Sequence, residues 1–250
     1  MKEISYRVRM EMEEKSSSKT QKYCDLIIGQ RGFWPLFKYE IIMLCSSWIP
    51  GALGLFLRSK LFPFILKKCG KGVVFGCNLN LRHPHKIEIG DHVIIDDNCL
   101  LDAKGDTNQG ILIGDNVFIG RNTILSSKNG DIILEKHVNI GFNSYIFSGS
   151  SVRLKENCLV AAYCYFIGGD HSASELDKTV YEQHSLSKGI EIGSNCWFGA
   201  DVKVQDGVTI GDHSVIGTGA VVTRPLPEYS VSVGIPAKVI KDLRSPQNNS

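Results

Sequence analysis

The 250-residue sequence lacks a strong charge of either sign, because 28 Lys and Arg residues stand against 26 Asp and Glu residues, a formal net charge of +2. A nucleic-acid-binding domain is expected to be strongly basic, so this balance argues against nucleic acid as a partner. The sequence also has neither a Walker A motif nor a G-x-G-x-x-G phosphate loop. Nucleotide hydrolysis and hydride transfer therefore have no support.

The cysteines include no C-x-x-C pair, which leaves a zinc ribbon or a thioredoxin-type motif unsupported. Residues 1–19 are charged and contain no apolar stretch of the kind that a secretory signal needs. These two absences predict a cytoplasmic protein in a reducing compartment. The repeats described below contain no close pair of histidines, so we expect no metal site.

A hydrophobic run long enough to span a bilayer is also missing, since such a helix needs about 20 apolar residues. The most apolar stretch, residues 41–57, is shorter and is interrupted by Pro50, Gly51 and Gly54. Two interpretations of residues 41–66 remain open. They form short helices that cap a neighbouring domain, or they form an interfacial membrane anchor with Trp48, Arg58, Lys67 and Lys68 at the level of the lipid headgroups.

A repeat of six residues dominates the rest of the sequence. Apolar anchors follow a strict step of six at Ile192, Phe198, Val204, Ile210, Ile216 and Val222. The residue after many anchors is Gly, and the fourth residue after each is small or β-branched. Shorter runs in the same register begin at Ile89, Ile113, Leu134 and Leu154. This period is neither the 3.6 of a helix nor the 2 of a strand.

Such a repeat predicts an all-β solenoid, in which each six residues form a short strand and a corner and three sides close a coil of about 18 residues. The Gly after the anchor suits a corner because it accepts unusual backbone angles. Stacked coils share one apolar core, since no coil buries its face alone. We expect residues 1–70 to form a polar N-terminus followed by an apolar helical cap or membrane-surface segment. The solenoid is expected at 71–241 and a polar tail at 242–250.

Three phrases, IGDNVFIGRNTIL, GVTIGDHSVIGTGAVVT and VGIPAKVIK, resemble the left-handed parallel β-helix acyltransferases of the hexapeptide-repeat superfamily. The resemblance covers residues 73–241 and is greatest to the maltose, galactoside and nodulation-type sugar O-acetyltransferases. It implies a left-handed coil, acetyl-CoA as the acyl donor and a homotrimer whose active sites are shared between subunits. Exposed coil aromatics would suit such contacts: Phe118, Tyr145, Tyr163 and Tyr165.

The repeat breaks once at length, between the anchors Phe166 and Ile192. A long irregular excursion, here residues 167–189, is usually either functional or disordered. Acyl transfer from a thioester needs a base for the acceptor hydroxyl, and neutral histidine suits that task. In the resembled enzymes the catalytic histidine lies at the root of such a loop, and His171 matches it. The plainer interpretation is a solvated loop histidine. His92, His137 and His213 fall on turns of the repeat, where polar residues are expected.

Four further residues are candidates for binding the acceptor. Asp170 is adjacent to His171, Glu175 follows in the same loop, and the resemblance places Trp197 beside the active site. The asparagine that related enzymes carry on the preceding coil matches Gly141 here, so the nearby Asn143 is only an approximate counterpart. This departure leaves the identity of the acceptor open.

The resemblance also assigns the coenzyme side of the site. Positions that contact acetyl-CoA in the resembled enzymes match Ala200, Thr218, Thr223, Arg224, Lys238 and Lys241. We therefore predict an acetyl-CoA-dependent O-acetyltransferase that acts on a sugar hydroxyl in surface polysaccharide or glycolipid assembly. One alternative is N-acylation of an amino sugar carried on a nucleotide. The other is a non-catalytic β-helix scaffold, for which His171 would be dispensable.

Overall fold

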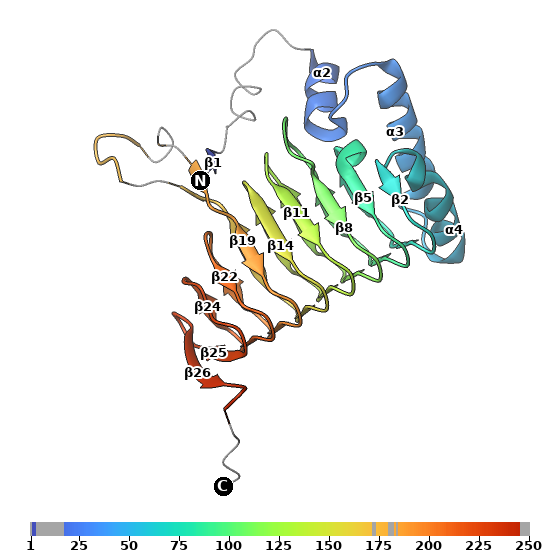
Figure 1. The fold of residues 1–250 in the computed structure, drawn as a ribbon. Coiled ribbons are helices and arrows are strands. Elements are labelled where there is room, and N and C mark those ends of the chain that lie inside the picture. Colours follow the sequence, from blue (N-terminus) through green and yellow to red (C-terminus); the bar gives the residue numbers. More distant parts are fainter. Residues whose placement is uncertain (1, 4–17, 172–173, 180–182, 184, 246–250) are drawn as a thin grey trace.

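The computed structural model describes residues 2–3, 18–171, 174–179, 183 and 185–245. Most of this chain forms a solenoid of three parallel sheets, with helices at its N-terminal end (Figure 1). The helices are α2 (Lys19–Tyr23), the π-helix Cys24–Ile28, α3 (Phe33–Ser46), α4 (Gly51–Leu61) and the 3-10 helices Phe62–Phe64 and Pro84–Lys86.

The three long sheets are numbered in the order in which each coil visits them. Sheet 1 contains β2 (Lys68–Cys69), β5 (Ile87–Ile89), β8 (Ile111–Ile113), β11 (Asp131–Leu134), β14 (Ser151–Leu154), β19 (Ile190–Ile192) and β22 (Thr209–Ile210). Sheet 2 contains β3 (Val74–Phe75), β6 (Ile94–Ile95), β9 (Phe118–Ile119), β12 (Asn139–Ile140), β15 (Leu159–Val160), β20 (Trp197–Phe198), β23 (Val215–Ile216), β25 (Ser230–Val233) and β26 (Lys238–Asp242). Sheet 3 contains β4 (Asn80–Arg82), β7 (Leu100–Asp102), β10 (Ile124–Ser127), β13 (Tyr145–Ser148), β16 (Tyr165–Gly168), β21 (Lys203–Val204) and β24 (Val221–Val222).

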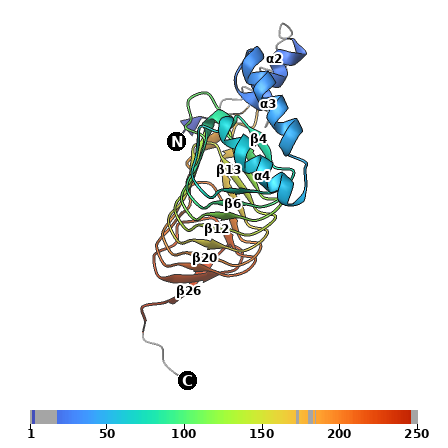
Figure 2. The same cartoon turned by 90° about the vertical axis from the view of Figure 1, so that its right-hand side faces the viewer.

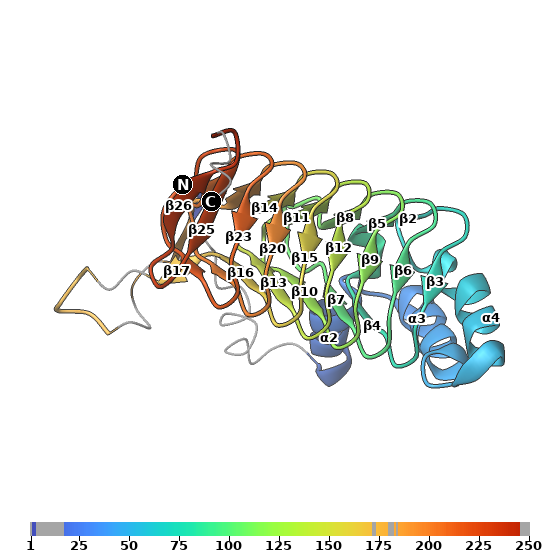
Figure 3. The same cartoon turned by 90° about the horizontal axis from the view of Figure 1, so that it is seen from below.

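Each coil contributes one strand to each sheet and pairs in parallel with the next coil, so the described residues form seven complete coils before β25 (Figures 1 and 3). The anchors point inward and are buried from Ile89 to Val222, as are the small residues at the fourth position, such as Cys99, Val138 and Ala220. This arrangement confirms the predicted β-helix of hexapeptide repeats.

Two of the three corners have a fixed length. The corner from sheet 1 to sheet 2 and the corner from sheet 2 to sheet 3 contain four residues in each coil. The third of these residues has a positive φ, and it is usually Asn, which tolerates the left-handed region better than most residues. His92, His137 and His213 occupy this position with φ of 56°, 61° and 57°. The expectation that they are turn residues is therefore confirmed.

The glycines after the anchors serve a different purpose from the one expected. Gly114, Gly120 and Gly141 are not among the residues with positive φ. A Cβ on Gly120 would lie 2.6 Å from the backbone N of Phe142, and one on Gly141 would lie 2.6 Å from the N of Ala162. Glycine is needed there because the next coil passes too close for a side chain, and the expected explanation by backbone angles was wrong.

We predict that Gly141→Ala lowers the free energy of unfolding by about 1–3 kcal/mol, because the added methyl group overlaps the backbone of the next coil. Denaturation in guanidinium chloride measures this change. Ala161→Ser is the matched control, since that position in the next coil already holds a Cβ, and its midpoint should move little. Equal midpoints for the two variants would contradict the close-approach explanation.

The third corner, from sheet 3 back to sheet 1, varies in length. The 18-residue coil expected from the repeat is found where Ile192 pairs with Ile210, whereas Ile89 pairs with Ile113, a longer step. The extra residues lie at this corner, in the segments 83–86, 103–110, 128–130, 149–150 and 169–189. The expected coil of about 18 residues is therefore found in the later coils, the earlier coils are longer, and the insertions lie along one edge of the solenoid.

Helices α3 and α4 pack over the N-terminal end of the solenoid, while β26 lies at the opposite end (Figure 2). Tyr39, Ile42 and Phe62 are buried in the same apolar core as the coils. The Tyr39 hydroxyl donates a hydrogen bond of 2.9 Å to the carbonyl oxygen of Leu81. Among the described helices, none combines the length and apolar character that crossing a bilayer requires.

Arg58 of α4 ties the helices to the first coil. Its guanidinium is buried and donates from Nε to the carbonyl oxygen of Phe75 at 2.8 Å. Its Nη1 donates to the carbonyl oxygens of Ser46 at 2.9 Å and Ile49 at 2.6 Å. One side chain thus satisfies backbone groups of α3, of the turn before α4 and of strand β3.

We predict that Arg58→Met destabilises the protein by about 3 kcal/mol or more, because buried carbonyl groups lose their donor at a cost of about 1–3 kcal/mol each. Thermal unfolding followed by circular dichroism measures the loss. Lys60→Met, on the exposed side of the same helix, should stay within about 0.5 kcal/mol of the parent. A similar small effect for Arg58→Met would show that water replaces these hydrogen bonds.

Candidate active site

The longest insertion leaves the solenoid between β16 and β19 and forms a small sheet of its own (Figure 1). Strand β17 (Asp170–His171) pairs antiparallel with β18 (Ser185–Ser187), so that His171 lies opposite Ser185 and Asp170 opposite Leu186. Strand β1 (Lys2–Glu3) pairs with the other edge of β18. The backbone of the predicted base is therefore part of a hairpin, while the positions of the Asp170 and His171 side chains lie outside what the structure describes.

A cluster of hydrogen bonds holds the root of this loop. The Ser187 hydroxyl donates to the carbonyl oxygen of Gly168 at 2.9 Å, which joins the two ends of the excursion. Its oxygen lies 2.7 Å from the hydroxyl oxygen of Ser150 on the preceding coil. The Asp206 carboxylate on the following coil accepts from the backbone N–H groups of Lys188 at 2.8 Å and Gly189 at 2.9 Å. Three coils thus fix the points where the loop leaves and returns.

Gln183 organises the outer part of the loop. Its side chain is buried, and Nε2 donates to the carbonyl oxygens of Glu175 at 2.9 Å and Lys178 at 3.2 Å. Its Oε1 accepts from the backbone N of Glu175 at 3.1 Å. The Glu175 carboxylate pairs with Lys178, so this predicted acceptor contact is part of an ion pair within the loop.

Sequence reasoning missed Ser187, Asp206 and Gln183, although one of them leaves a recognisable signal. The 103–110 insertion ends in the same way, with Asp131 Oδ1 accepting from the N–H groups of Gln109 at 2.7 Å and Gly110 at 2.9 Å. Both loops return through a glycine with positive φ, and both bind an Asp of the next coil. In both cases the insertion ends in a residue followed by Gly, and an Asp in the next coil accepts hydrogen bonds from the backbone N–H groups of these two residues. This pair of features is the sequence signal of an insertion that is held against the next coil.

We predict that Asp206→Ala raises the rate of tryptic cleavage at Lys178 and Lys188 by about 5- to 30-fold, because losing acceptors for the loop's N–H groups costs about 1–2 kcal/mol of local stability. Mass spectrometry of timed digests locates the cuts. Glu191→Ala removes only an exposed ion pair with Lys155 and is the control. Unchanged cleavage in Asp206→Ala would mean that the loop is held by other contacts.

A strip of outward-facing residues on sheet 3 leads to the root of the loop. Partners on successive strands of this strip are Arg82, Asp102, Ser126, Phe147 and Ile167. Burial raises the pKa of the Asp102 carboxyl, although Arg82 at 3.7 Å acts in the opposite direction. The Lys128 ammonium lies 5.8 Å from the centre of the Phe147 ring, and Tyr145 stacks near the same ring. The sequence pattern did not single out this mixed polar and aromatic strip.

The other predicted site residues, both those for coenzyme and the acceptor contacts Trp197 and Asn143, lie on the coils of the solenoid. Trp197 is exposed on β20 of sheet 2, and Ala200 and Thr218 lie on adjacent coils at the corner between sheets 2 and 3. Asn143 lies at this corner too, where it supplies the residue with positive φ. Thr223 and Arg224 follow β24, and Lys238 and Lys241 are exposed on β26.

Within one chain the loop with His171 is not brought together with Ala200, Thr218 and Asn143, whereas Thr223 and Arg224 follow β24 at the same corner from which the loop leaves. The loop with His171 leaves at the corner between sheets 3 and 1, whereas Ala200, Thr218 and Asn143 occupy the corner between sheets 2 and 3 (Figure 3). Sheet 3 lies between these two edges.

The cysteines, all within the described ranges, are free thiols. Cys99 and Cys164 point into the core, where burial raises the pKa of each thiol to about 11. They are protonated at neutral pH and are unsuited to nucleophilic attack. In the described part of the chain, no three His, Cys, Asp or Glu side chains gather as a metal site would require.

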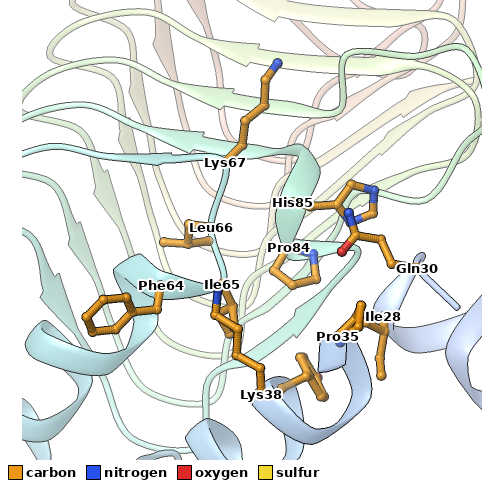
Figure 4. Close-up of a pocket in the computed structure, with 11 residues that line it drawn as sticks. Ile28, Gln30, Pro35, Lys38, Phe64, Ile65, Leu66, Lys67, Pro84 and His85 are labelled. Carbon is orange, nitrogen blue, oxygen red and sulfur yellow. The ribbon is translucent and has the colours of Figure 1, made fainter. Parts of the chain in front are cut away.

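A cavity of about 190 Å³ lies where the N-terminal helices meet the first coils. Figure 4 shows His85 and Gln30 near one another on one side and Lys38 beside Ile65 on the other. Most of its lining is apolar, including Pro35, Phe64 and Leu66. The cavity lies at the N-terminal end of the solenoid, several coils away from β16 and β19, between which the loop with His171 leaves (Figure 1).

Comparisons with known proteins agree with this architecture. The family described as bacterial transferase hexapeptide (six repeats) matches residues 189–224, and the family described as hexapeptide repeat of succinyl-transferase matches residues 131–165. A variant of AntD, an N-acyltransferase from Bacillus cereus in complex with dTDP and coenzyme A, superposes with a TM-score of 0.54 at 19% identity, over 80% of this chain and 92% of that chain. At this identity the likeness concerns the fold.

Curated relatives share more of the sequence over shorter stretches. A probable acetyltransferase of Mycobacterium tuberculosis is 32% identical over 52% of this chain and 43% of its own length. A putative acetyltransferase of Staphylococcus aureus is 36% identical over 45% and 56%, and the galactoside O-acetyltransferase of Escherichia coli is 30% identical over 52% and 63%. The chain thus spans about half the length of these relatives. In its matched repeats and stacked coils the chain is similar to hexapeptide-repeat acetyltransferases.

Proposed function

We propose that this protein transfers an acetyl group from acetyl-CoA to a hydroxyl group of a saccharide, with His171 as the general base. The observation that carries the proposal is the 169–189 excursion, which interrupts a regular solenoid and is hydrogen-bonded to three coils at its root. A loop held in this way keeps a reactive side chain in place, as general-base catalysis requires. Relatives named as acetyltransferases support the same chemistry.

In the proposed reaction, His171 removes the proton from the acceptor hydroxyl as its oxygen attacks the thioester carbonyl. Backbone N–H groups stabilise the negative charge on the tetrahedral intermediate. When the intermediate collapses, the carbon–sulfur bond breaks, and the protonated His171 returns the proton to the departing thiolate. The acetyl ester and free CoA are the products, so atoms and charges balance.

The coenzyme binds on the side of the site formed by the last coils. Ala200 and Thr218 present exposed backbone along which the pantetheine arm lies. Trp197 forms a wall beside them and contacts the acceptor. Arg224, Lys238 and Lys241 supply positive charge for the phosphates at the nucleotide end. Because Ala200 and Thr218 lie at a different corner from the loop of their own chain, the proposal includes a homotrimer in which each site joins the loop of one chain to the coils of the next.

The acceptor side is formed by the loop and the sheet 3 strip that leads to it. Aromatic rings such as Tyr145 and Phe147 provide flat apolar faces, and Asp102 and Lys128 provide hydrogen-bonding groups beside them. This combination suits a sugar ring, which has apolar faces and polar edges. Asp170, Glu175 and Asn143 are the remaining proposed contacts, and a glycan or glycolipid made inside the cell is the proposed acceptor.

We predict that His171→Ala reduces acetyl-CoA turnover with a saccharide acceptor by about 100-fold or more, the usual contribution of a general base. Thiol release across a panel of sugars measures the rate. His137→Asn is the control, because Asn tolerates the positive φ of that corner and the residue is remote from the loop. Equal turnover by the parent and His171→Ala would remove this residue from the mechanism.

Mixing two inactive variants tests the shared site. If His171 of one chain works with Trp197 of the next, co-refolded trimers of His171→Ala and Trp197→Ala chains contain intact sites in about a quarter of positions. The mixed trimers should therefore recover about a quarter of the parent's activity, whereas each variant alone stays inactive. No recovery would place both residues in one chain's site.

Two rival functions give different outcomes in the same assays. An N-acyltransferase would turn over amino sugars on nucleotides and leave unmodified sugars untouched. A scaffold would release no thiol with any acceptor, and calorimetry would detect no binding of acetyl-CoA. Either result would replace the O-acetyltransferase proposal.

A further inference from the structure

The N-terminal helices expose a continuous apolar stripe. On α3 and the turn after it, the exposed side chains Trp34, Phe37, Ile41, Leu44 and Trp48 follow steps of three and four residues. Such steps place them on one side of a helix. Trp34, Leu44 and Trp48 are 74%, 67% and 62% exposed, and the Trp48 indole donates to the carbonyl oxygen of Leu44 at 2.7 Å, which fixes it at the end of the stripe. We call this stripe the outer apolar face.

The opposite side of α3 is already occupied. Tyr39, Ile42 and Ser46 are buried against the solenoid and α4, half a helical turn away from the outer apolar face. A surface helix normally turns polar residues to the side away from the core. An apolar stripe on both sides therefore indicates that α3 has a second apolar partner beside the solenoid.

Helix α4 and the residues just after it also expose apolar side chains. Leu53 and Phe56 are exposed on it, and Phe64 is exposed just beyond it. The Lys60 ammonium lies 5.9 Å from the centre of the Phe56 ring. Aromatic rings interspersed with lysines whose stems lie along apolar surface are typical of the boundary between lipid headgroups and acyl chains.

The net charge of residues 18–68 indicates whether the partner surface is anionic or cationic. Residues 18–68 contain eight basic residues, Lys19, Lys22, Arg31, Lys38, Arg58, Lys60, Lys67 and Lys68, and two acidic ones, Asp25 and Glu40. Asp25 pairs with Arg31, and Glu40 accepts a hydrogen bond from the Tyr23 hydroxyl. Arg58 is buried and Lys67 pairs with Glu88. The exposed lysines Lys19, Lys38, Lys60 and Lys68 take no part in these pairs and give this segment an excess of positive charge, whereas the whole chain has a net charge of only +2. An anionic surface complements it.

The geometry favours a helix lying on a bilayer. With 14 residues α3 is roughly 21 Å long, shorter than the hydrocarbon core of about 30 Å. We propose that the outer apolar face of α3, continued by α4, docks the protein on an anionic lipid bilayer, with its apolar side chains at the acyl boundary and its lysines at the headgroups. The solenoid is then held at the membrane by its N-terminal end. This inference is independent of the proposed chemistry.

Vesicle flotation tests the docking with the full-length protein. We expect binding to vesicles of phosphatidylglycerol and phosphatidylcholine, at least tenfold weaker binding to phosphatidylcholine alone, and weaker binding at high salt. The variant Trp34→Ser/Leu44→Ser should reduce the partition coefficient on the mixed vesicles at least tenfold. The control Val74→Ser/Ile94→Ser changes two side chains of sheet 2 that are 41% and 42% exposed and should bind as the parent does.

Circular dichroism and light scattering on each variant separate docking from folding and assembly. The proposal requires that Trp34→Ser/Leu44→Ser keeps the parent's melting curve and oligomeric mass while losing vesicle binding. No binding of the parent to mixed vesicles, or undiminished binding of this variant, would overturn it. A lower oligomeric mass for this variant would also overturn it, because the face would then be covered by a second copy of the chain. Equal binding to neutral vesicles would overturn the assignment to an anionic surface.

Discussion

The close stacking of parallel coils is the constraint on which the rest of this structure depends. Each strand hydrogen-bonds to the corresponding strand of the next coil, and two of the three corners turn in four residues in each coil. That geometry requires a residue with positive φ at the third place and leaves no room for a side chain at several anchor-following glycines, such as Gly141. The six-residue repeat in the sequence therefore reflects the close stacking of coils and not the strand propensity of individual residues.

The same constraint determines where function is located. Because two corners are fixed, additional chain leaves the solenoid only where sheet 3 returns to sheet 1. The loops at this corner are tied to neighbouring coils by carboxylates, Asp131 for one insertion and Asp206 for another. A rigid solenoid therefore presents its irregular segments along one edge, and the loop that contains His171 is the longest of them.

The two ends of the solenoid are closed in different ways. At the C-terminal end β26 folds back antiparallel on β25 and continues sheet 2. At the N-terminal end Arg58 links α3, α4 and the first coil through backbone carbonyl groups. A closed core does not need apolar residues on the outer side of α3, so the exposed Trp34 and Leu44 call for a partner outside the solenoid.

The sequence by itself determined the fold class, because anchors at a strict period from Ile192 to Val222 are compatible with few other architectures. It also located the break at 167–189, since a lost period is visible without coordinates. Only the tertiary structure decided which parts of the chain meet. Ser187, Asp206 and Gln183 act through contacts between coils or across a loop, and such contacts leave little trace in local sequence. The separation of Ala200 and Thr218 from the loop likewise depends on which corner each coil position occupies, a property of the closed coil and not of the repeat.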